Sequence, residues 1–455
     1  MHVQSAVASV PAEPQPLLRR LDAVGIIVGI VIGAGIFKTP PMIAGLAGDP
    51  GWVIAAWIAG GIISLAGALC YAELASAFPH AGGDYHFLTR AYGRHVSFLY
   101  AWARATVINT GSIALLAFVF ADYFASVFGI PAGGGSNVFA LLVVIALTIL
   151  NIAGLRLTAR AQNAMTLGLV LGLVALVLAA PFAPLPDAAA PQAFSAQPAT
   201  GMLGLAMVFV LLTYGGWNEA AYISAELKGG RNAIVGALVI SIGVIAALYI
   251  AVNVALISGL GFKALADSKT AGADLMTRAF GPWAGQALGA IVSLAVLTSI
   301  NGTMITGART NYAMGRDWPS LRFLSGWNAT RGVPVMAYIV QALIAIALIG
   351  FGSLQHDGFE AMVEFTAPVF WLFFFLVGVS LFVLRARHAA VERPFRVPLY
   401  PVTPLLFCMV CAYLFYSSVM YAASKDAVHV SLVVMAIGIV ALALTGAAGR
   451  TGRKV

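Results

Sequence analysis

The chain has 455 residues, of which 61% are hydrophobic and only 9% are charged. Soluble globular domains carry roughly 25% charged residues, so this composition excludes a soluble globular protein and indicates an integral membrane protein. The formal net charge of +8 would suggest nucleic-acid binding in a soluble chain. Here the basic residues gather in alternate loops, so we predict contact with the lipid bilayer and no nucleic-acid partner.

Twelve segments are apolar enough to cross a bilayer, which takes about 20 residues as a helix. They are residues 22–45, 51–77, 95–125, 138–154, 160–183, 202–226, 231–259, 284–312, 333–351, 359–384, 398–421 and 427–447. If both termini lie on the same side of the membrane, most of the 25 Lys and Arg residues lie on that side too. Because basic residues are enriched in cytoplasmic loops, we predict a multi-pass protein of the plasma (bacterial inner) membrane with both termini in the cytoplasm. The first twenty residues are polar and the first apolar segment is too long for a signal-peptide core, so no cleavable signal is expected.

The first segment is weakened at one place. It contains Gly33-Ala34-Gly35, and Pro40 and Pro41 follow a few residues later. Glycine is about 1 kcal/mol less favourable than alanine inside a helix, and proline removes a backbone donor. Broken backbone at membrane depth is tolerated where protein or a watery cavity surrounds it. We therefore interpret Gly33-Ala34-Gly35 as a substrate cradle.

Ionisable and polar residues follow in the next two segments. Glu73 closes the second segment and is either a proton carrier or a structural partner of an arginine at the inner surface. Arg104, in the third segment, is expected to reach the inner interface or to pair with a carboxylate. Asn109, Thr110 and Ser112 either line a pathway or bond to neighbouring helices.

A second weak point appears in the sixth segment, after a Pro- and Ala-rich loop at about 184–200 that divides the chain into two halves. Tyr214-Gly215-Gly216-Trp217 is followed by the polar residues Asn218 and Glu219. This interruption lies five crossings after the first, so the second copy is inverted relative to the first. Paired Gly-interrupted segments in two halves point to a transporter site at the bilayer midplane. For either glycine pair alone, close helix packing is the alternative.

The remaining segments carry fewer signals. Thr298, Ser299 and Asn301 form a polar cluster that either ligates a cation or bonds helix to helix. Glu364 is expected at the outer interface. Cys408-x-x-Cys411 lacks a second ligand pair, and with Cys70 it is interpreted as ordinary helix-face residues, with metal or redox chemistry as the alternative. We predict no metal site and no cofactor.

Interrupted helices define a specific chemistry. The N–H groups and positive dipole end of the half-helix after Gly33 suit a carboxylate, and the carbonyls before each break suit an ammonium group or a cation. A zwitterionic amino acid offers both charges. The sequence has no nucleotide-binding G-x-x-x-x-G-K-[ST] loop and no enzyme motif, so neither an ATP-driven pump nor an enzyme is predicted. Glu219 either titrates during transport or bonds to a neighbouring helix, with Arg104 as one partner.

Several motifs carry a family resemblance. Gly33-Ala-Gly-Ile-Phe-Lys-Thr-Pro40 resembles the G-[SA]-G-I-F-x-[ST]-P of first helices in the amino acid–polyamine–organocation (APC) superfamily. Tyr214-Gly-Gly-Trp-Asn218, with Glu226, Arg231 and Asn232, is similar to the sixth helix of its L-type amino acid transporter branch. Further matches are Glu73, Pro79, Gly82-Gly83-Asp84-Tyr85 and the run from Arg393-Pro to Tyr400-Pro.

The resemblance implies a LeuT-type fold with twelve transmembrane helices, in which helices 1 and 6 are discontinuous. The first repeat would span residues 22–183, the inverted second repeat 202–384 and two extra helices 398–447, between cytoplasmic tails at 1–21 and 448–455. It implies that a substrate carboxylate meets the backbone of Gly33, Ala34 and Gly35. The substrate amino group would meet the carbonyls of Val31, before the first break, and of Leu212 and Gly215 at the second break. Asn218 would contribute to side-chain specificity, and Tyr214 and Gly216 complete the predicted substrate-binding residues.

Three departures from the family pattern affect this expectation. Ala34 replaces a serine found in some members, so a hydroxyl contact is lost while the N–H remains. Leu212 replaces an aromatic gate, so occlusion would differ or use Tyr214. Leu169 replaces a lysine that mimics a bound cation in several members, which leaves the coupling mode open between exchange, H+ and Na+. The candidates for a coupling or proton site are Glu219, Leu169, Thr298 and Ser299.

The sequence therefore predicts a secondary active transporter of L-amino acids, expected to be neutral, that works by alternating access. A polyamine or amine permease or exchanger is the alternative within transport, although only Glu219 would supply a carboxylate near the site. A non-transporting membrane receptor or scaffold is the alternative of another class. No obligatory protein partner is predicted.

Overall fold

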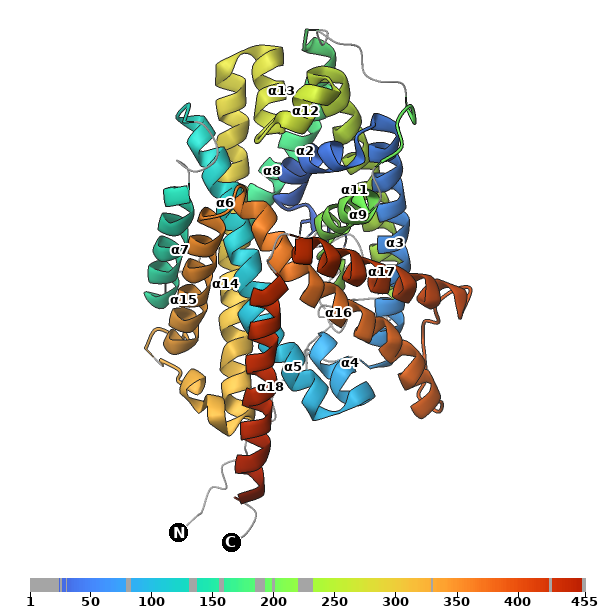
Figure 1. The fold of residues 1–455 in the computed structure, drawn as a ribbon, viewed down its shortest axis with the longest axis vertical. Helices are drawn as coiled ribbons and strands as arrows, with labels where there is room; N and C mark the ends of the chain where they lie inside the picture. Colours follow the sequence, from blue (N-terminus) through green and yellow to red (C-terminus); the bar gives the residue numbers. More distant parts are fainter. Residues whose placement is uncertain are drawn as a thin grey trace, which may run out of the picture.

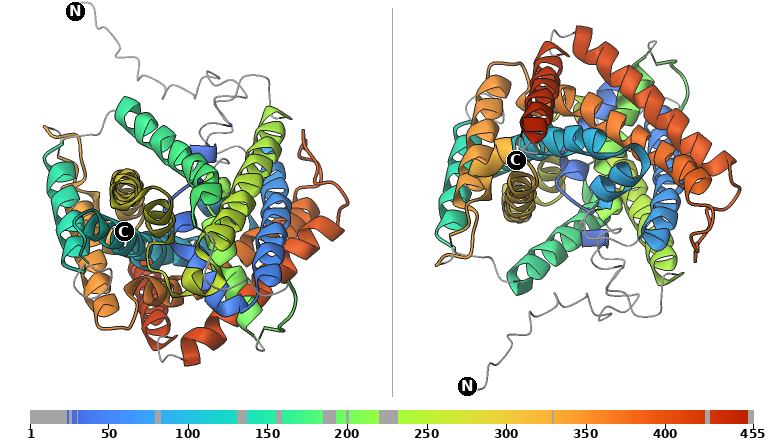
Figure 2. Two further views of the ribbon diagram at one scale, coloured as in Figure 1. Left: turned by 90° about the horizontal axis from the view of Figure 1, so that it is seen from above. Right: turned by 90° about the horizontal axis from the view of Figure 1, so that it is seen from below.

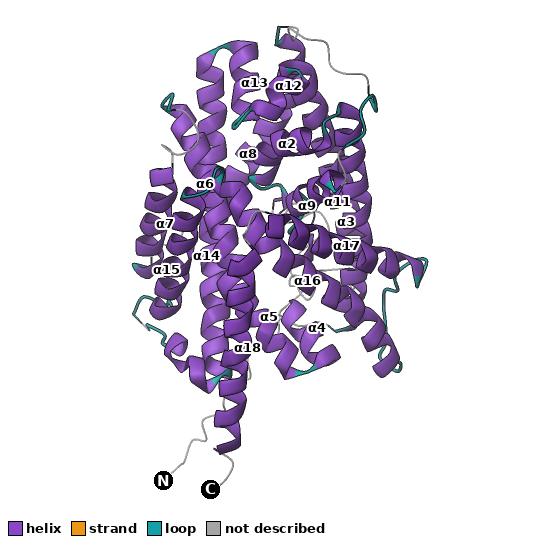
Figure 3. Cartoon of the chain, in the orientation of Figure 1, coloured by secondary structure: helices purple, strands orange, loops and turns teal. Residues whose placement is uncertain are grey.

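The computed structural model describes residue 24 and residues 27–29, 31–78, 83–130, 137–154, 159–184, 193–198, 201–219, 232–328, 330–424 and 428–451. These residues are almost entirely helical (Figure 3), and the only strand-like pairing among them is one isolated bridge between Asn328 and Val333. Several residues of the motifs above, namely Pro79, Gly82, Glu226 and Arg231, lie outside the described part.

The helices are given in chain order, first those of the first half of the chain and then the others. The helices of the first half are α2 (Gly35–Ala47), α3 (Pro50–Ala77), α4 (Gly83–Tyr92), α5 (Arg94–Ala103), α6 (Asn109–Val127), α7 (Asn137–Ile152) and α8 (Ala159–Ala179). The remainder are α9 (Met202–Thr213), α11 (Asn232–Leu260), α12 (Phe262–Asp267), α13 (Ala271–Phe280), α14 (Pro282–Asp317), α15 (Val335–Ser353), α16 (Gly358–Arg387), α17 (Val402–Ser424) and α18 (Val428–Thr451).

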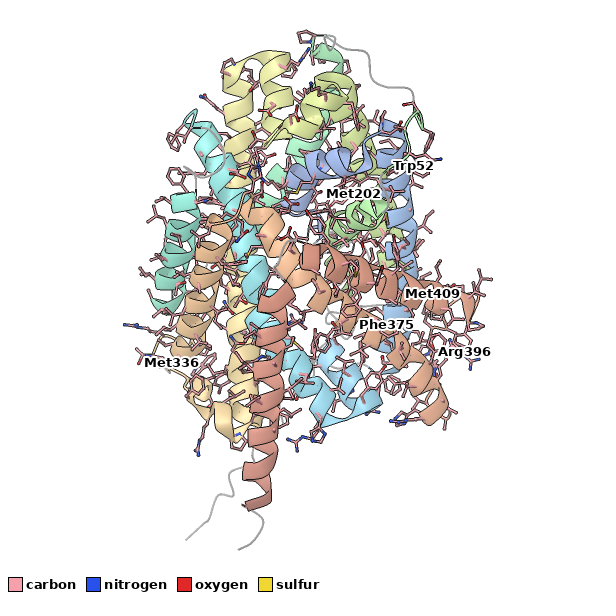
Figure 4. The ribbon with its side chains drawn as sticks, viewed as in Figure 1. Trp52, Met202, Met336, Phe375, Arg396 and Met409 are labelled. Atoms are coloured by element: carbon pink, nitrogen blue, oxygen red, sulfur yellow. The ribbon has the colours of Figure 1, made fainter. Side chains whose placement is uncertain are left out.

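The helices form an elongated bundle around α2, α6 and α9. The helices α7 and α15 lie on one flank, and α3 and α17 lie on the other. This arrangement is seen in the side view and in the views along the long axis (Figures 1 and 2). The short helices α12 and α13 cover one end of the bundle, and α4 and the end of α18 lie toward the other (Figure 1). On the flanks, large apolar side chains such as Met336 and Met409 are exposed (Figure 4). This apolar exterior is the surface expected of a protein that lies in lipid.

Seven of the described helices are long and apolar enough to cross a membrane, and four shorter apolar helices accompany them. The expectation of an all-α membrane protein with several crossings agrees with this finding. The exact number of crossings stays a prediction. The sequence did not predict α12 and α13, because their residues lie in a polar connection between two apolar segments.

A buried carboxylate fixes the end of the bundle that carries α4. Glu73 accepts two hydrogen bonds from Arg385, at 2.7 and 2.5 Å, and one from the backbone N–H of Val397 at 2.7 Å. Arg393 Nε lies 3.5 Å from the same carboxylate. The expected arginine partner of Glu73 is therefore confirmed. The contact ties α3 to the end of α16 and to the segment that leads to α17, where Arg396 lies at the edge of the molecule (Figure 4).

A second buried carboxylate that joins separate segments lies at the opposite end of α3. Asp49 caps that helix and accepts hydrogen bonds from the backbone N–H of Gly51 at 2.7 Å, and of Phe194 and Ser195 at 2.8 Å each. The carboxylate thereby fastens the loop between the two halves of the chain. Burial raises the pKa of Asp49, but the bonds from Phe194, Ala196, Gly51 and Ser195 outweigh it and lower that pKa to about 2.

Candidate functional site

The first helix is interrupted where the glycines predicted it. Residues 27–29 and Val31 are helical, Ile32–Ala34 form a turn, and α2 begins at Gly35. No side chain caps the start of α2 at Ala34. Because the first N–H groups of a helix have no partner within it, this end offers backbone donors and a positive dipole end to an anion. The backbone chemistry expected of the cradle is therefore available here.

The two glycines of the break have different surroundings. A Cβ atom added at Gly33 would meet only the carbonyl oxygen of Val31, at 3.9 Å, among the described atoms within 4 Å. A Cβ atom at Gly35 would lie 3.2 Å from Cγ2 and 3.3 Å from Oγ1 of Thr213. Gly33 thus borders open space, whereas Gly35 permits close packing of α2 against the end of α9.

The second interruption follows α9. This helix ends at Thr213, the turn 214–216 follows, and a short 3-10 turn spans Trp217–Glu219. Gly216 has a φ of 108°, which a residue with a side chain rarely adopts. The N–H of Gly215 donates to the carbonyl of Leu212 at 3.1 Å. The Gly215-Gly216 pair therefore turns the chain sharply at the end of α9.

Direct contacts join the two interruptions. The hydroxyls of Thr39 and Thr213 lie 2.9 Å apart. Each also lies within hydrogen-bond distance of a carbonyl in its own helix, that of Gly35 or Phe209 respectively, and one of the two hydroxyls donates to the other. The structure thus brings together two chain breaks that are far apart in the sequence.

A tyrosine that the sequence did not single out bridges the same two breaks. The hydroxyl of Tyr249, on α11, lies 3.0 Å from the carbonyl oxygen of Val31 and 3.4 Å from that of Thr213. Val31 O, the carbonyl expected to receive an ammonium group, also accepts the N–H of Gly33 at 2.8 Å. The only available signal was a polar side chain within the apolar segment 231–259.

Tyr214 packs against neighbouring helices. Its hydroxyl donates to the carbonyl of Trp57 at 3.1 Å, and its ring packs against the rings of Trp57 and Tyr249. The side chain thus fills the space between α3 and α11. Leu212 is partly exposed and Asn218 is buried in the 3-10 turn.

The described candidates for a coupling site, Leu169, Thr298 and Ser299, make none of the contacts above. The side chain of Glu219 is outside the described part of the chain, and Leu169 is buried in α8. Thr298 and Ser299 donate to the carbonyl of Ala295 in their own helix, at 2.6 and 3.3 Å. The neighbouring Asn301 accepts a hydrogen bond from Asn151 of α7 at 2.7 Å, which is the helix-to-helix role given above as the alternative for this cluster.

Arg104 begins an unusual turn in the helix that contains it. Residues Arg104–Ile108 form a π-helical turn between α5 and α6, a feature found frequently at functional sites. Arg104 Nη1 donates to the hydroxyl of Tyr100 at 3.2 Å, and this hydroxyl donates to Asp84 at 3.0 Å. Arg104 therefore belongs to a polar group that links this turn to α4.

The family model "Amino acid permease" matches residues 18–442. The chain belongs to this family, and the resemblance to the APC superfamily is thereby confirmed. Because its members are permeases and the described helices are apolar, the chain is a multi-pass membrane protein.

Three relatives illustrate the range of similarity. The b(0,+)-type amino acid transporter 1 of Homo sapiens is 28% identical over 407 residues, which cover 88% of this chain and 82% of the relative. The large neutral amino acids transporter small subunit 2 of Mus musculus is 28% identical over 400 residues, covering 85% and 74%. The serine/threonine exchanger SteT of Bacillus subtilis (strain 168) is 26% identical over 389 residues, covering 85% and 87%.

Proposed function

We propose that this protein is a secondary active transporter that moves neutral L-amino acids across the plasma membrane by alternating access. The observation that carries the proposal is the contact between two interrupted helices, which presents helix-start N–H groups and helix-end carbonyls to one place. Family membership and the relatives, which are named as amino acid transporters or exchangers, support it.

The proposed binding mode uses the backbone. The substrate carboxylate binds the N–H groups at Ala34 and Gly35, where the helix dipole favours negative charge. It also takes the N–H of Gly33 from the carbonyl of Val31, to which that N–H donates in the structure, and thereby frees a lone pair on Val31 O. The ammonium group binds the carbonyls of Val31, Leu212 and Gly215. Since the Tyr249 hydroxyl already lies against Val31 O, we infer that this hydroxyl positions the carbonyl for the ammonium group.

The topology proposed with this function is the LeuT-type one, with twelve crossings and both termini in the cytoplasm. In this orientation the end with α4 and the Glu73–Arg385 contact faces inward, and the end with α12 and α13 faces outward. The basic loops support this orientation, because Lys and Arg favour the cytoplasmic side. We also propose that the protein catalyses no chemical reaction on its substrate.

Coupling to H+ or Na+, or obligatory exchange, completes the proposal. A lysine at the position of Leu169 would supply a fixed positive charge, and leucine does not. Glu219, Thr298 and Ser299 are the proposed alternatives for a coupling site. An amine permease is less well supported, since an amine lacks the carboxylate that the start of α2 would bind.

Uptake by purified protein in liposomes tests the proposal. A panel of labelled amino acids and amines is offered with and without a pH gradient, external Na+ and internal substrate. We expect uptake or exchange of neutral L-amino acids, and the gradient that stimulates it identifies the coupling. No uptake or exchange of any amino acid or amine would favour the receptor or scaffold alternative.

A further inference from the structure

A buried ion pair lies one turn beyond the cradle. The ammonium of Lys38, on α2, is 2.6 Å from a carboxylate oxygen of Asp122, on α6. The side chains are only 3% and 10% exposed. Lys38 follows Gly35 by three residues, a rise of about 4.5 Å along the helix axis. Gly272 of α13, at the outward end in the proposed orientation, packs against Phe37, the neighbour of Lys38, so the pair lies on the outward side of the cradle.

Adjacent residues reinforce the same junction. Tyr123, next to Asp122, donates its hydroxyl to the carbonyl of Phe37, next to Lys38, at 2.8 Å. The rings of Phe37 and Tyr123 meet edge-on, with centroids 6.1 Å apart. A Cβ atom on Gly272 of α13 would lie 3.3 Å from the Phe37 ring and 3.6 Å from the Tyr123 hydroxyl. Hence α13 covers a junction at which α2 and α6 are held by two contacts.

A second ion pair continues the charges toward the surface. Asp357 caps α16, and its carboxylate lies 2.5 Å from the ammonium of Lys269, whose side chain is 42% exposed. Phe359 follows Asp357 by two residues, and its ring centroid lies 5.9 Å from Lys38 Nζ, so this ring adjoins both pairs. Burial raises the pKa of Asp357, but the charges of Lys38 and Lys269 outweigh it and hold that pKa below its ordinary value. Four alternating charges thus connect α6, α2, α16 and the segment before α13.

We propose that the Lys38–Asp122 pair is the outer closure of the cradle and that a zwitterionic amino acid opens it by giving each charge a replacement partner. This inference rests on the proposed function and adds a first binding station to it. The substrate carboxylate meets Lys38, and the substrate ammonium group meets Asp122. The amino acid then passes to the backbone groups of the two breaks.

The energetics of buried charge favour this sequence of events. Breaking a buried pair without replacement leaves two unpaired charges, which is strongly unfavourable. A zwitterion supplies both missing partners, so it lowers the free energy of opening where a neutral or singly charged molecule would not. The closed pair therefore resists opening when no amino acid is present. Lys38 occupies the variable position x of the family motif G-[SA]-G-I-F-x-[ST]-P, so the motif itself does not require a charged residue there.

Amine labelling of the intact protein tests the closure. Proteoliposomes are treated from outside with a membrane-impermeant N-hydroxysuccinimide ester, and modified lysines are identified by mass spectrometry of peptides. Without amino acid, we expect Lys269 to be labelled and Lys38 to be protected. A saturating transported amino acid should raise the ratio of Lys38 to Lys269 labelling; the ratio is used because the free amino acid also consumes part of the ester. The Asp122→Asn variant should label at Lys38 without amino acid.

Uptake kinetics test the binding station. The Lys38→Met/Asp122→Asn variant leaves no unpaired buried charge, so it keeps the fold even if Asp122→Asn alone does not. We expect its outside KM to rise by about tenfold, equivalent to 1.4 kcal/mol, with the inside KM unchanged. The matched control is Lys269→Met, which breaks the pair between the partly exposed Lys269 and the buried Asp357 and should change neither KM.

The outcomes separate the two levels of the proposal. Labelling of Lys38 as fast as Lys269 without amino acid would overturn the closure, and an unchanged ratio of Lys38 to Lys269 labelling during active uptake would overturn the opening by substrate. An unchanged outside KM in the double variant would overturn the binding station. If the wild-type protein takes up no amino acid, the proposed function fails. The closure can still be tested in that case, because the protection of Lys38 from labelling in the wild type, and the loss of that protection in Asp122→Asn, do not depend on uptake.

Discussion

The hydroxyls of Thr39 and Thr213 lie 2.9 Å apart, although the two residues are separated by 174 positions in the chain. Thr39 belongs to the half-helix that follows the first break, and Thr213 is the last residue of the helix before the second. Gly35 makes the approach feasible, because a side chain there would press on Thr213. The two breaks are thus assembled by their own contacts before any substrate binds.

Replacing Thr213 with valine should weaken this assembly while keeping its shape. The Thr39 hydroxyl retains its bond to the Gly35 carbonyl, so no buried group is orphaned, and the expected loss of stability is about 1 kcal/mol. Because α2 and α9 would no longer be held in register, KM for the amino acid should rise. Thermal unfolding in detergent and uptake kinetics measure the two effects. The control is Thr148→Val, whose hydroxyl bonds to Val144 in its own helix, far from the breaks. Equal KM values in the two variants would contradict a role of Thr213 at the site.

Removing the hydroxyl of Tyr249 should impair substrate binding. In Tyr249→Phe the carbonyls of Val31 and Thr213 lose a shared donor, so the carbonyl that receives the ammonium group is less well positioned. We expect the KM for amino acids to rise by about tenfold, equivalent to 1.4 kcal/mol. Tyr214→Phe removes a neighbouring hydroxyl that bonds to Trp57 instead, and its KM should stay near that of the wild type. A larger effect in Tyr214→Phe than in Tyr249→Phe would reverse this assignment.

Local features of the sequence were sufficient to place the two interruptions. Glycine and proline act through backbone conformation, so Gly33, Gly35 and the Gly215-Gly216 pair mark the breaks without knowledge of their neighbours. The partner of Glu73 could be expected as an arginine at the same surface, because a carboxylate buried at a helix end needs a cation. The long apolar segments of the chain similarly indicated the membrane-spanning helices.

Contacts between distant segments could not be predicted in the same way. Lys38 is a basic residue within the first apolar segment, and nothing near it in the sequence shows that it is buried in α2 and paired with Asp122, 84 positions away. Tyr249 reaches Val31 across 218 positions, and its spacing within its own apolar segment does not reveal that contact. The role of Tyr214 in helix packing likewise depends on Trp57, which belongs to another helix.

Replacement of Glu73 with glutamine should destabilise the fold more than it alters substrate affinity. The variant leaves Arg385 and Arg393 without their carboxylate, and breaking a buried pair on one side costs about 3–5 kcal/mol. The protein should therefore unfold at lower temperature, with KM little changed in the fraction that remains folded. Glu392→Gln, at an exposed position in the connection after α16, is the control and should unfold at the wild-type temperature. A wild-type unfolding temperature for Glu73→Gln would refute the structural role.

The hydrogen bonds to the Asp49 carboxylate should make the stability of the fold depend on pH in the acid range. Its pKa in the folded protein is lowered to about 2 from an ordinary 3.8, so its contribution to stability is complete above pH 3.8. That contribution is lost as the pH falls toward 2, because the protonated carboxyl accepts the bonds of Phe194 and Ser195 less well. Unfolding temperatures of the wild type and Asp49→Asn, measured between pH 5 and pH 2, should converge as the pH falls. A constant difference over this range would show that ionisation of Asp49 is not involved.

The most direct test of the cradle is the Gly33→Val variant, examined for folding and uptake together. A Cβ atom added at Gly33 meets only the Val31 carbonyl oxygen, at 3.9 Å, so the variant should insert and unfold at a temperature close to the wild type, with a stability change within about 0.5 kcal/mol. Gly35→Val, by contrast, should also destabilise the contact with Thr213. We predict that Gly33→Val in proteoliposomes takes up no amino acid, because its methyl groups occupy the space in which the substrate carboxylate binds. Wild-type uptake by this folded variant would contradict the assignment of Gly33-Ala34-Gly35 as the substrate cradle.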